Sequence, residues 1–222
     1  MAKVFLSAGH GGTDPGAVAN GLKEKDINLN TLKACREELE RHGVTVICSR
    51  TKDENDPVTE EVKEANASGA DIAASFHANA GGGNGFEAFY YSTSAQGKQL
   101  ARLAEKHIKA IGQNSRGIKT GNHLYFVKNT KMPAILFESF FVDNSTDVKI
   151  GNTAAEQRKF GTAYAKAILE YLDIKYKEKA ATGEIYRVQV GAFREKANAE
   201  ALQNELRDKG YAAILTKATA KI

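Results

Sequence analysis

Three side chains near the ends of predicted strands, and one at the entry to a predicted helix, could together bind a metal ion and move protons. His10 closes the segment VFLSAGH, His77 closes DIAASFH, and Glu138 lies near the end of AILFES. Glu24 stands where the loop after the first segment enters a helix. Two histidines and one carboxylate with an open coordination position form a catalytic zinc site, and a second carboxylate can serve as acid and base. These residue types predict zinc-assisted hydrolysis of a carbonyl compound.

The third metal ligand cannot be assigned from spacing alone. Glu24 and Asp26 both fall at the start of the predicted helix, and Asp14 lies nearer to His10 in the sequence. Carboxylates are favourable in the first turn of a helix even without a metal, because they face the positive end of the helix dipole. From the residues by themselves, Glu24, Asp26 and Asp14 are all candidates.

The predicted elements explain how these side chains could meet. Short apolar segments alternate with amphipathic helical segments, which is the pattern of an α/β fold with a mostly parallel, twisted sheet flanked by helices. Ligands gather beyond the carboxyl ends of such strands, so a parallel sheet would bring the candidate residues to one rim. The strands are expected at 3–8, 44–49, 71–76, 86–91, 124–127 and 134–137, and the helices at 24–42, 59–68, 95–112 and 154–172.

The chain is predicted to consist of a main domain and a small appendage. Residues 1–173 form the main domain, and residues 174–184 (IKYKEKAATGE) have the charged and small side chains of a linker. Residues 185–222 begin a new β-α-β pattern, which is short for a domain that folds alone. In this appendage we expect strands at 185–190 and 211–216 and a helix at 194–209.

Composition excludes several classes of protein. Of the 222 residues, 42% are hydrophobic and 26% are charged, as in ordinary globular chains. The formal net charge is +4 with no block of lysine and arginine, which argues against nucleic-acid binding. Cys35 and Cys48 are too few for a disulfide scaffold and are expected to be reduced thiols. No apolar run of membrane-spanning length is present, so no membrane span is expected.

The first residues, MAKVFLSAGH, lack the long apolar region of a signal peptide. We therefore expect the protein to be made in the cytoplasm without a signal peptide.

Four motifs in order resemble one known family. The segments GHGGTDPGA, NGLKEKDINL, SFHANA and NTKMPAILFES are similar to those of zinc-dependent N-acetylmuramoyl-L-alanine amidases, over about residues 3–173. The resemblance implies a Zn²⁺ cofactor and cleavage of the amide between N-acetylmuramic acid and L-alanine in peptidoglycan. It also implies that His10, Glu24 and His77 are the zinc ligands and that Glu138 is the catalytic acid and base.

Other residues around these motifs carry weaker expectations. Asn79 would lie on the same side of an extended strand as His77, and we predict that it either supports the site residues or contacts the peptide of the substrate. Asn129, in the loop before the last predicted strand, is predicted to contact substrate. Arg50 ends a strand near the rim, where it could bind a substrate carboxylate, but pairing with Asp53 is favoured.

The sequence also carries expectations about the backbone and the pocket near the site. Gly11 and Gly12 would permit a tight turn and a close approach of the backbone to the site. Many members of the resembled family have glycine two residues after the catalytic glutamate, whereas Phe140 stands there in this chain. We expect Phe140 to change the lining of the pocket.

The tail has a resemblance of its own. IYRVQVGAFREKANAEALQNELRDKGYAAIL resembles one SPOR-type repeat, and such domains bind glycan strands of the cell wall. Only half of a ferredoxin-like unit is present, which would leave an open sheet edge. Two expectations remain equally open: two chains combine their halves into a homodimer, or the second half has been lost and the tail docks weakly.

Two rival functions and two routes to the wall also remain open at this stage. A non-catalytic wall-binding protein would need no active site, and another zinc peptidase could use the same two histidines and glutamate. Without a signal peptide, the protein would reach the cell wall after release by a holin, as a phage endolysin, or after lysis of a sporulating mother cell. The SPOR-like repeat slightly favours the second route.

Overall fold

The computed structural model describes residues 2–179, 189–211 and 213–217. The chain divides into two compact units, Met1–Lys177 and Glu178–Ile222, which we describe separately. Within the described residues, no helix is long and apolar enough to cross a membrane.

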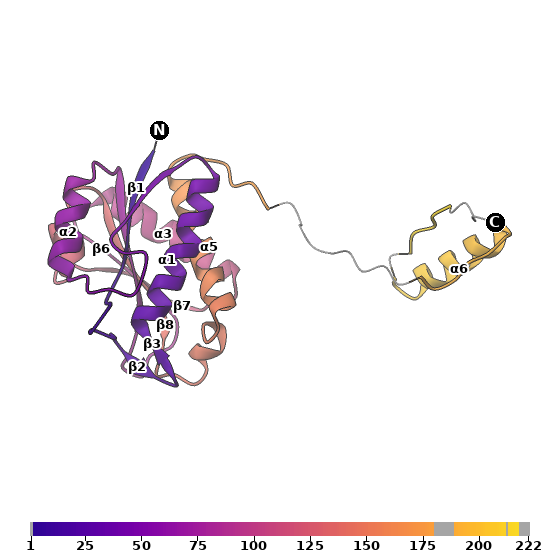
Figure 1. The fold of residues 1–222 in the computed structure, drawn as a ribbon, viewed down its shortest axis with the longest axis horizontal. Coiled ribbons are helices and arrows are strands. Elements are labelled where there is room, and N and C mark those ends of the chain that lie inside the picture. Colours follow the sequence, from indigo (N-terminus) through magenta and orange to yellow (C-terminus); the bar gives the residue numbers. More distant parts are fainter. Residues whose placement is uncertain (1, 180–188, 212, 218–222) are drawn as a thin grey trace. The chain divides into compact units, whose positions relative to one another are not determined.

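The first unit is built on the central sheet seen in Figure 1. The sheet has six strands in the order β4-β1-β5-β8-β6-β7. Every neighbouring pair is parallel except β6 and β8, which are antiparallel. This arrangement confirms the predicted α/β class with a mostly parallel sheet. The strands are β1 (Lys3–Ala8), β4 (Thr45–Cys48), β5 (Ile72–Asn79), β6 (Phe86–Tyr90), β7 (Ser115–Thr120) and β8 (Ala134–Phe141).

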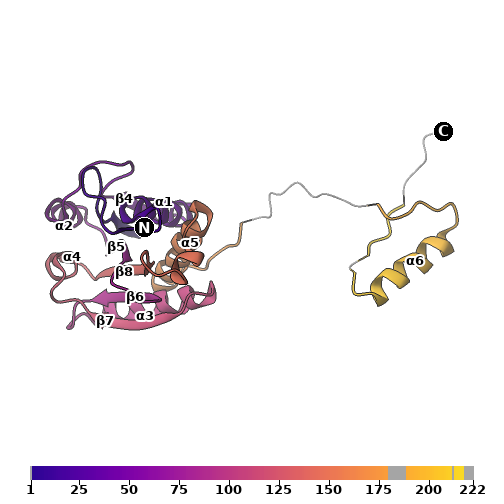
Figure 2. The same cartoon turned by 90° about the horizontal axis from the view of Figure 1, so that it is seen from below.

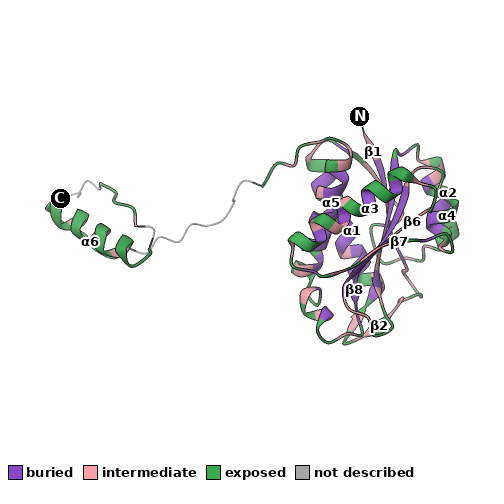
Figure 3. Ribbon diagram, turned by 180° about the vertical axis from the view of Figure 1, so that it is seen from behind, coloured by how far each residue is buried: buried purple, intermediate pink, exposed green. Residues whose placement is uncertain are grey.

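Three long helices cover one face of this sheet (Figure 2). They are α1 (Glu24–Arg41), α3 (Ala95–Ala110) and α5 (Ala154–Tyr171), and α5 begins with a capping box between Thr153 and Glu156. Alternate strand residues such as Leu6, Phe76 and Phe137 point into this layer and are fully buried. Figure 3 shows the buried strands between helices whose outer sides are exposed. Burial of this apolar face supplies most of the stabilisation of the unit.

The opposite face of the sheet is only partly covered. Two shorter helices, α2 (Val58–Ala67) and α4 (Tyr125–Asn129), pack together there. Their apolar side chains form a second cluster with Phe5, Ala73 and Ala134, which stand near the starts of three parallel strands. The carboxyl halves of the strands on this face are therefore left for polar side chains, and the candidate site lies there.

Some predicted elements differ from the structure. The segment 124–127 was expected as a strand, but it enters α4, whose Phe126 packs against the α2 layer. The polar strand β7 was not predicted, because its side chains are partly exposed at the edge of the sheet. A two-stranded hairpin of β2 (Val18–Ala19) and β3 (Leu22–Lys23) was also not predicted. Its turn, Asn20-Gly21, has two positive φ angles, as a type I′ turn requires.

The start of the predicted linker packs against the first unit. The ring of Tyr176 stacks on His42 with centroids 4.9 Å apart, and its hydroxyl donates to Glu38 Oε2 at 3.1 Å. Lys177 N donates to His42 Nε2 at 2.8 Å. Residues 174–177 therefore belong with α1 rather than with a free linker.

The second unit contains α6 (Lys196–Asp208), which agrees with the helix predicted at 194–209. Most of the strand predicted at 185–190 lies outside the described residues. The strand predicted at 211–216 is wrong for the residues described there, which are not paired as a strand. Most of their side chains are exposed, Ile214 at 86%, so no described residue buries them as the face of a strand would be buried.

Candidate functional site

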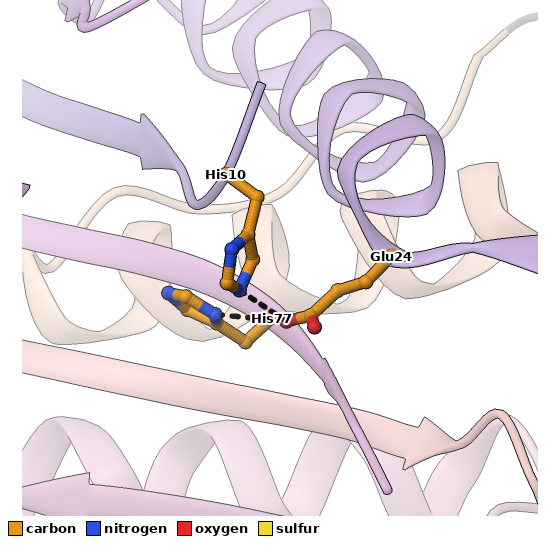
Figure 4. A group of neighbouring side chains, drawn as sticks. All are labelled: His10, Glu24 and His77. Atoms are coloured by element: carbon orange, nitrogen blue, oxygen red, sulfur yellow. Dashed lines mark hydrogen bonds and ion pairs between the residues drawn. The ribbon is translucent and has the colours of Figure 1, made fainter. Parts of the chain in front are cut away.

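His10, Glu24 and His77 converge on one point at the carboxyl rim of the sheet (Figure 4). One ligand atom from each lies within 4.8 Å of the others. Glu24 Oε1 is 2.9 Å from His77 Nδ1 and 3.2 Å from His10 Nε2. His10 follows β1, Glu24 begins α1 and His77 lies on β5, so three elements supply the group. Donor atoms of this type and spacing could hold a metal ion.

The loop after β1 aims the His10 ring at this point. His10 has φ of +65°, a left-handed conformation that few residues other than glycine adopt. Its Nδ1 is 2.8 Å from Asp14 Oδ2, and a carboxylate can only accept, so Nδ1 carries a proton. Gly16 N donates to the other oxygen of Asp14 at 2.9 Å. The loop thus fixes the ring so that Nε2 faces Glu24.

The electrostatics of the group centre on the buried carboxylate of Glu24. Although burial raises the pKa of Glu24, hydrogen bonds from His10 and His77 hold it well below its ordinary value. The hydrogen bond to Glu24 in turn raises the pKa of His10 to about 9. Burial lowers the pKa of His77, but its contact with Glu24 outweighs this and the pKa is raised overall. A negative charge is thus held permanently between two imidazoles.

Glu138 lies beside this group on β8, in register with His77 on β5. Its Oε2 atom is buried and has no hydrogen-bond partner among the described residues. Burial raises the pKa of Glu138 to about 7, against the opposing influence of His77. A carboxyl group that titrates near neutrality and has one oxygen without a partner among the described residues is suited to accept and return a proton.

Two glycines permit the close packing of the group, and they are not the pair expected from the sequence. A Cβ atom at Gly9 would lie 2.1 Å from the His77 ring, and one at Gly16 would lie 2.6 Å from Glu24 Oε2. Gly11 and Gly12 form the tight turn expected of them, since both have positive φ angles and Gly11 pairs with Asp14. A Cβ atom on either of them would meet the 54–55 segment.

The structure separates the three candidate carboxylates. Glu24 is buried and faces both imidazoles, whereas Asp26 is exposed in the first turn of α1. Asp14 contacts the far nitrogen of His10, on the other side of the ring from Glu24. Of the three, Glu24 alone meets both histidines at their point of convergence.

The two asparagines predicted to contact substrate lie in different places. Asn79 ends β5 close to the site, and its Nδ2 donates to Glu87 at 3.3 Å. Asn129 ends α4, before the start of β8, and is bonded to Tyr125 and Asn66. It therefore lies toward the opposite end of the strands, and the structure does not bring it together with the site.

Arg50 has a role that sequence reasoning missed. Arg50 is 2% exposed. Its guanidinium donates to the carbonyl oxygens of Ala8 at 2.9 Å and Lys25 at 2.8 Å. It makes longer contacts with the carbonyl oxygens of Lys52 at 3.2 Å and Gly9 at 3.4 Å. The favoured pairing with Asp53 is wrong, because Asp53 binds Lys25 Nζ at 2.7 Å. Arg50 joins the end of β1 to the first turn of α1, the two places that present His10 and Glu24.

Phe140 does not line the site. It is fully buried in the α-helical layer, with its ring 5.7 Å from that of Phe160. The register between β5 and β8 shifts after Glu138, and such a bulge turns the following side chain to the other face. The expected change in pocket lining is therefore wrong.

Two imidazoles and a buried carboxylate that could hold a metal ion, with a second buried carboxyl group beside them at the rim of an α/β sheet, are the groups expected of a hydrolase site. Comparison with known proteins makes the assignment specific. Residues 4–170 match the Amidase_3 family, N-acetylmuramoyl-L-alanine amidase, and residues 182–221 match the SPOR domain. The chain belongs to the Amidase_3 family, and its substrate is peptidoglycan.

Proteins named as N-acetylmuramoyl-L-alanine amidases align with most of the chain. It is 38% identical to the N-acetylmuramoyl-L-alanine amidase CwlM of Bacillus licheniformis, over 97% of this chain and 85% of that protein. It is 34% identical to the sporulation-specific N-acetylmuramoyl-L-alanine amidase of Bacillus subtilis, over 97% and 84%. The catalytic domain of CwlV from Bacillus (Paenibacillus) polymyxa superposes with a TM-score of 0.73 and 31% identity, over 79% of this chain and all of that chain.

Proposed function

We propose that this amidase is zinc-dependent, with His10 Nε2, His77 Nδ1 and the Glu24 carboxylate as the protein ligands. The observation that carries the proposal is the contact between His10 and Glu24. Nε2 of His10 faces an oxygen of Glu24 at 3.2 Å, while Nδ1 of the same ring is engaged by Asp14. The raised pKa of His10 means that a proton occupies this contact in the metal-free site, and a divalent ion could replace that proton between the two atoms.

Zinc bound at such a site lowers the pKa of a water molecule and polarises a carbonyl group. The residues of the chain supply the remaining functions. Glu138 takes a proton from the attacking water molecule while the oxygen of that water bonds to the carbonyl carbon. It then donates that proton to the L-alanine nitrogen as the C–N bond breaks, which leaves a carboxyl group on the muramic acid and a free amine on the peptide. Its unpartnered Oε2 is the atom assigned to both transfers.

Mass spectrometry of products released from purified peptidoglycan tests this function. We expect intact glycan strands and free peptides beginning with L-alanine, with activity lost on chelation and restored by zinc. Cleavage within the peptides would indicate another zinc peptidase, and binding to walls without release would indicate a wall-binding protein. Activity that persists after complete removal of metal would contradict zinc dependence while leaving the amidase assignment intact.

The SPOR domain is a peptidoglycan-binding domain, and we propose that in this chain it holds the enzyme on glycan strands. The relative named as sporulation-specific favours release of the enzyme by mother-cell lysis over release by a holin. Pairing of two tails into a homodimer stays a prediction. Light scattering of the full chain at several concentrations tests it, and a monomer throughout would refute it.

A further inference from the structure

A row of ionisable side chains crosses the open half of the sheet face. His77 on β5 is in register with Glu138 on β8, and Glu138 is in register with Glu87 on β6. Side chains in register on neighbouring strands point to the same face of a sheet. The row therefore runs from the proposed zinc ligands, past the proposed acid and base, toward the edge strand β7.

Two cations on β7 end this row. Arg116 Nε and Lys119 Nζ each lie 2.5 Å from Glu87 Oε1, and Asn79 Nδ2 lies 3.3 Å from Glu87 Oε2. Glu87 is only 4% exposed, whereas the side chains of Arg116 and Lys119 are 44% and 38% exposed. Both cations are thus held from inside by one buried carboxylate, while other donors of each remain open to solvent.

The two cations are also fixed by aromatic rings. The Arg116 guanidinium carbon lies 5.3 Å from the centroid of Phe141, and Lys119 Nζ lies 5.9 Å from that of Phe89. Contacts of this kind hold a cation in one place and reduce the ordering needed when an anion binds. Two positive charges against the one negative charge of Glu87 leave a net positive surface beside Glu138.

The direction of the substrate follows from the proposed chemistry. Glu138 must reach the L-alanine nitrogen to protonate it, so the peptide leaves on the Glu138 side of the metal group and the sugar lies on the other side. β7 is two strands beyond β8, a distance of about 10 Å, which an extended peptide covers in about three residues. The first residues of the peptide after L-alanine would therefore pass Arg116 and Lys119.

We propose that Arg116 and Lys119, held by the buried Glu87, form a subsite that binds a carboxylate of the stem peptide within the first residues after L-alanine. The proposal rests on the amidase mechanism given above and adds the residues that select an acidic peptide. Arginine and lysine on one surface match the two oxygens of a carboxylate. Arg116 and Lys119 are substrate-binding residues in this view, and Glu87 is a positioning residue.

The test uses the full-length, zinc-loaded protein and two synthetic N-acetylmuramoyl peptides. Both begin with L-alanine, and the next residue is D-glutamate in one and its uncharged amide in the other. The measured quantity is the ratio of kcat/KM for the acidic substrate to that for the amide, because a loss of folded protein cancels in this ratio. We expect the wild-type ratio to be about tenfold, carried mainly by KM. The double variant Arg116→Met, Lys119→Met should bring it to about one.

Matched variants separate recognition from stability and from overall charge. Lys98→Met removes one positive charge from the exposed side of α3 and should keep the wild-type ratio. Arg116→Lys keeps the charge and should retain part of the preference. A wild-type ratio of one, or a ratio that the double variant leaves unchanged, would overturn the subsite. Cleavage of neither substrate by the wild type would instead refute the proposed function, and calorimetric binding of the two peptides to the same variants would then decide the subsite.

Discussion

A buried oxygen with no hydrogen-bond partner among the described residues distinguishes Glu138 from the other carboxylates of the site. Glu24 has a depressed pKa because two imidazoles face it, whereas burial raises the pKa of Glu138 to about 7. The surroundings of the two carboxyl groups thus favour different protonation states. Glu24 is suited to bind a cation, and Glu138 is suited to move a proton.

The variant Glu138→Gln should lose activity by about 10²–10⁴-fold, because an amide cannot exchange the proton. Zinc content and thermal stability should stay close to those of the wild type, since no described residue hydrogen-bonds Glu138 Oε2. Peptide release measures the activity, metal analysis by mass spectrometry measures the zinc content, and thermal denaturation measures the stability. Glu64→Gln, on the exposed surface of α2, is the control. Normal turnover by Glu138→Gln would remove Glu138 from the mechanism.

Asp14 should tune metal binding through His10. The carboxylate fixes the ring nitrogen that faces away from Glu24, and loss of such a partner commonly weakens metal binding about 10–100-fold. Asp14→Ala should show that loss in a zinc titration against a competing chelator. Asp53→Ala is a control in the same loop region, because Asp53 binds Gly12 N and Lys25 but no candidate ligand. An equal loss in both variants would mean that Asp14 acts only through loop structure.

At the residue level, the sequence predicts the side chains that stand at or near the ends of parallel strands. His10, His77 and Glu138 are expected at one rim because parallel strands end together, and the structure brings them there. The third carboxylate could not be chosen, because Glu24 and Asp26 are equally plausible in a first helical turn. Arg50 was misread because its acceptors are backbone carbonyls, which leave no mark in the sequence.

At the level of elements, the site depends on how β1 and α1 are held together. Arg50 bonds to the last residue of β1 and to the first turn of α1 from a buried position. Asn28 Nδ2 adds a bond to Gly9 O at 2.9 Å. These contacts fix the two segments that carry His10 and Glu24, although neither Arg50 nor Asn28 touches the ligand atoms.

Arg50→Met should lower the free energy of unfolding by about 3 kcal/mol, because several buried carbonyl groups lose their donor at once. Urea denaturation followed by circular dichroism measures this loss. Arg36→Met removes an exposed pair with Glu40, and it should cost less than about 1 kcal/mol. If the two variants lost equal stability, the clamp formed by Arg50 would be unimportant to the fold.

Elements with a strong apolar period are predicted well, and those at the edges are not. The long helices and the central strands follow from buried periodic residues. The segment Leu124–Val127 has the apolar residues of a strand, yet Phe126 is buried from a short helix, and periodicity cannot separate the two over so few residues. β7 is polar and partly exposed, so nothing in its composition distinguishes it from a loop, although it carries Arg116 and Lys119.

At the scale of the whole molecule, the catalytic unit has its own core and the tail unit does not bury its helix. None of the residues of α6 is buried, and among the described tail residues Val190, Tyr211 and Ile214 are 64%, 65% and 86% exposed. The proposed zinc ligands and the proposed acid and base all lie in the first unit. Catalysis and retention on the wall should therefore be separable.

A chain of residues 1–177 should cleave a soluble muramyl peptide with the kcat of the full chain but should sediment less with purified peptidoglycan. A chain of residues 1–173 should in addition unfold more easily, by about 1–2 kcal/mol. It lacks Tyr176, whose ring stacks on His42 and lies 4.3 Å from Lys166 Nζ. Peptide release, pelleting and urea denaturation of the three chains measure these differences. Equal stability of the two shorter chains would show that residues 174–177 are part of the linker. If the 1–177 chain pelleted with peptidoglycan as well as the full chain does, the SPOR unit would not be what holds the enzyme on the wall.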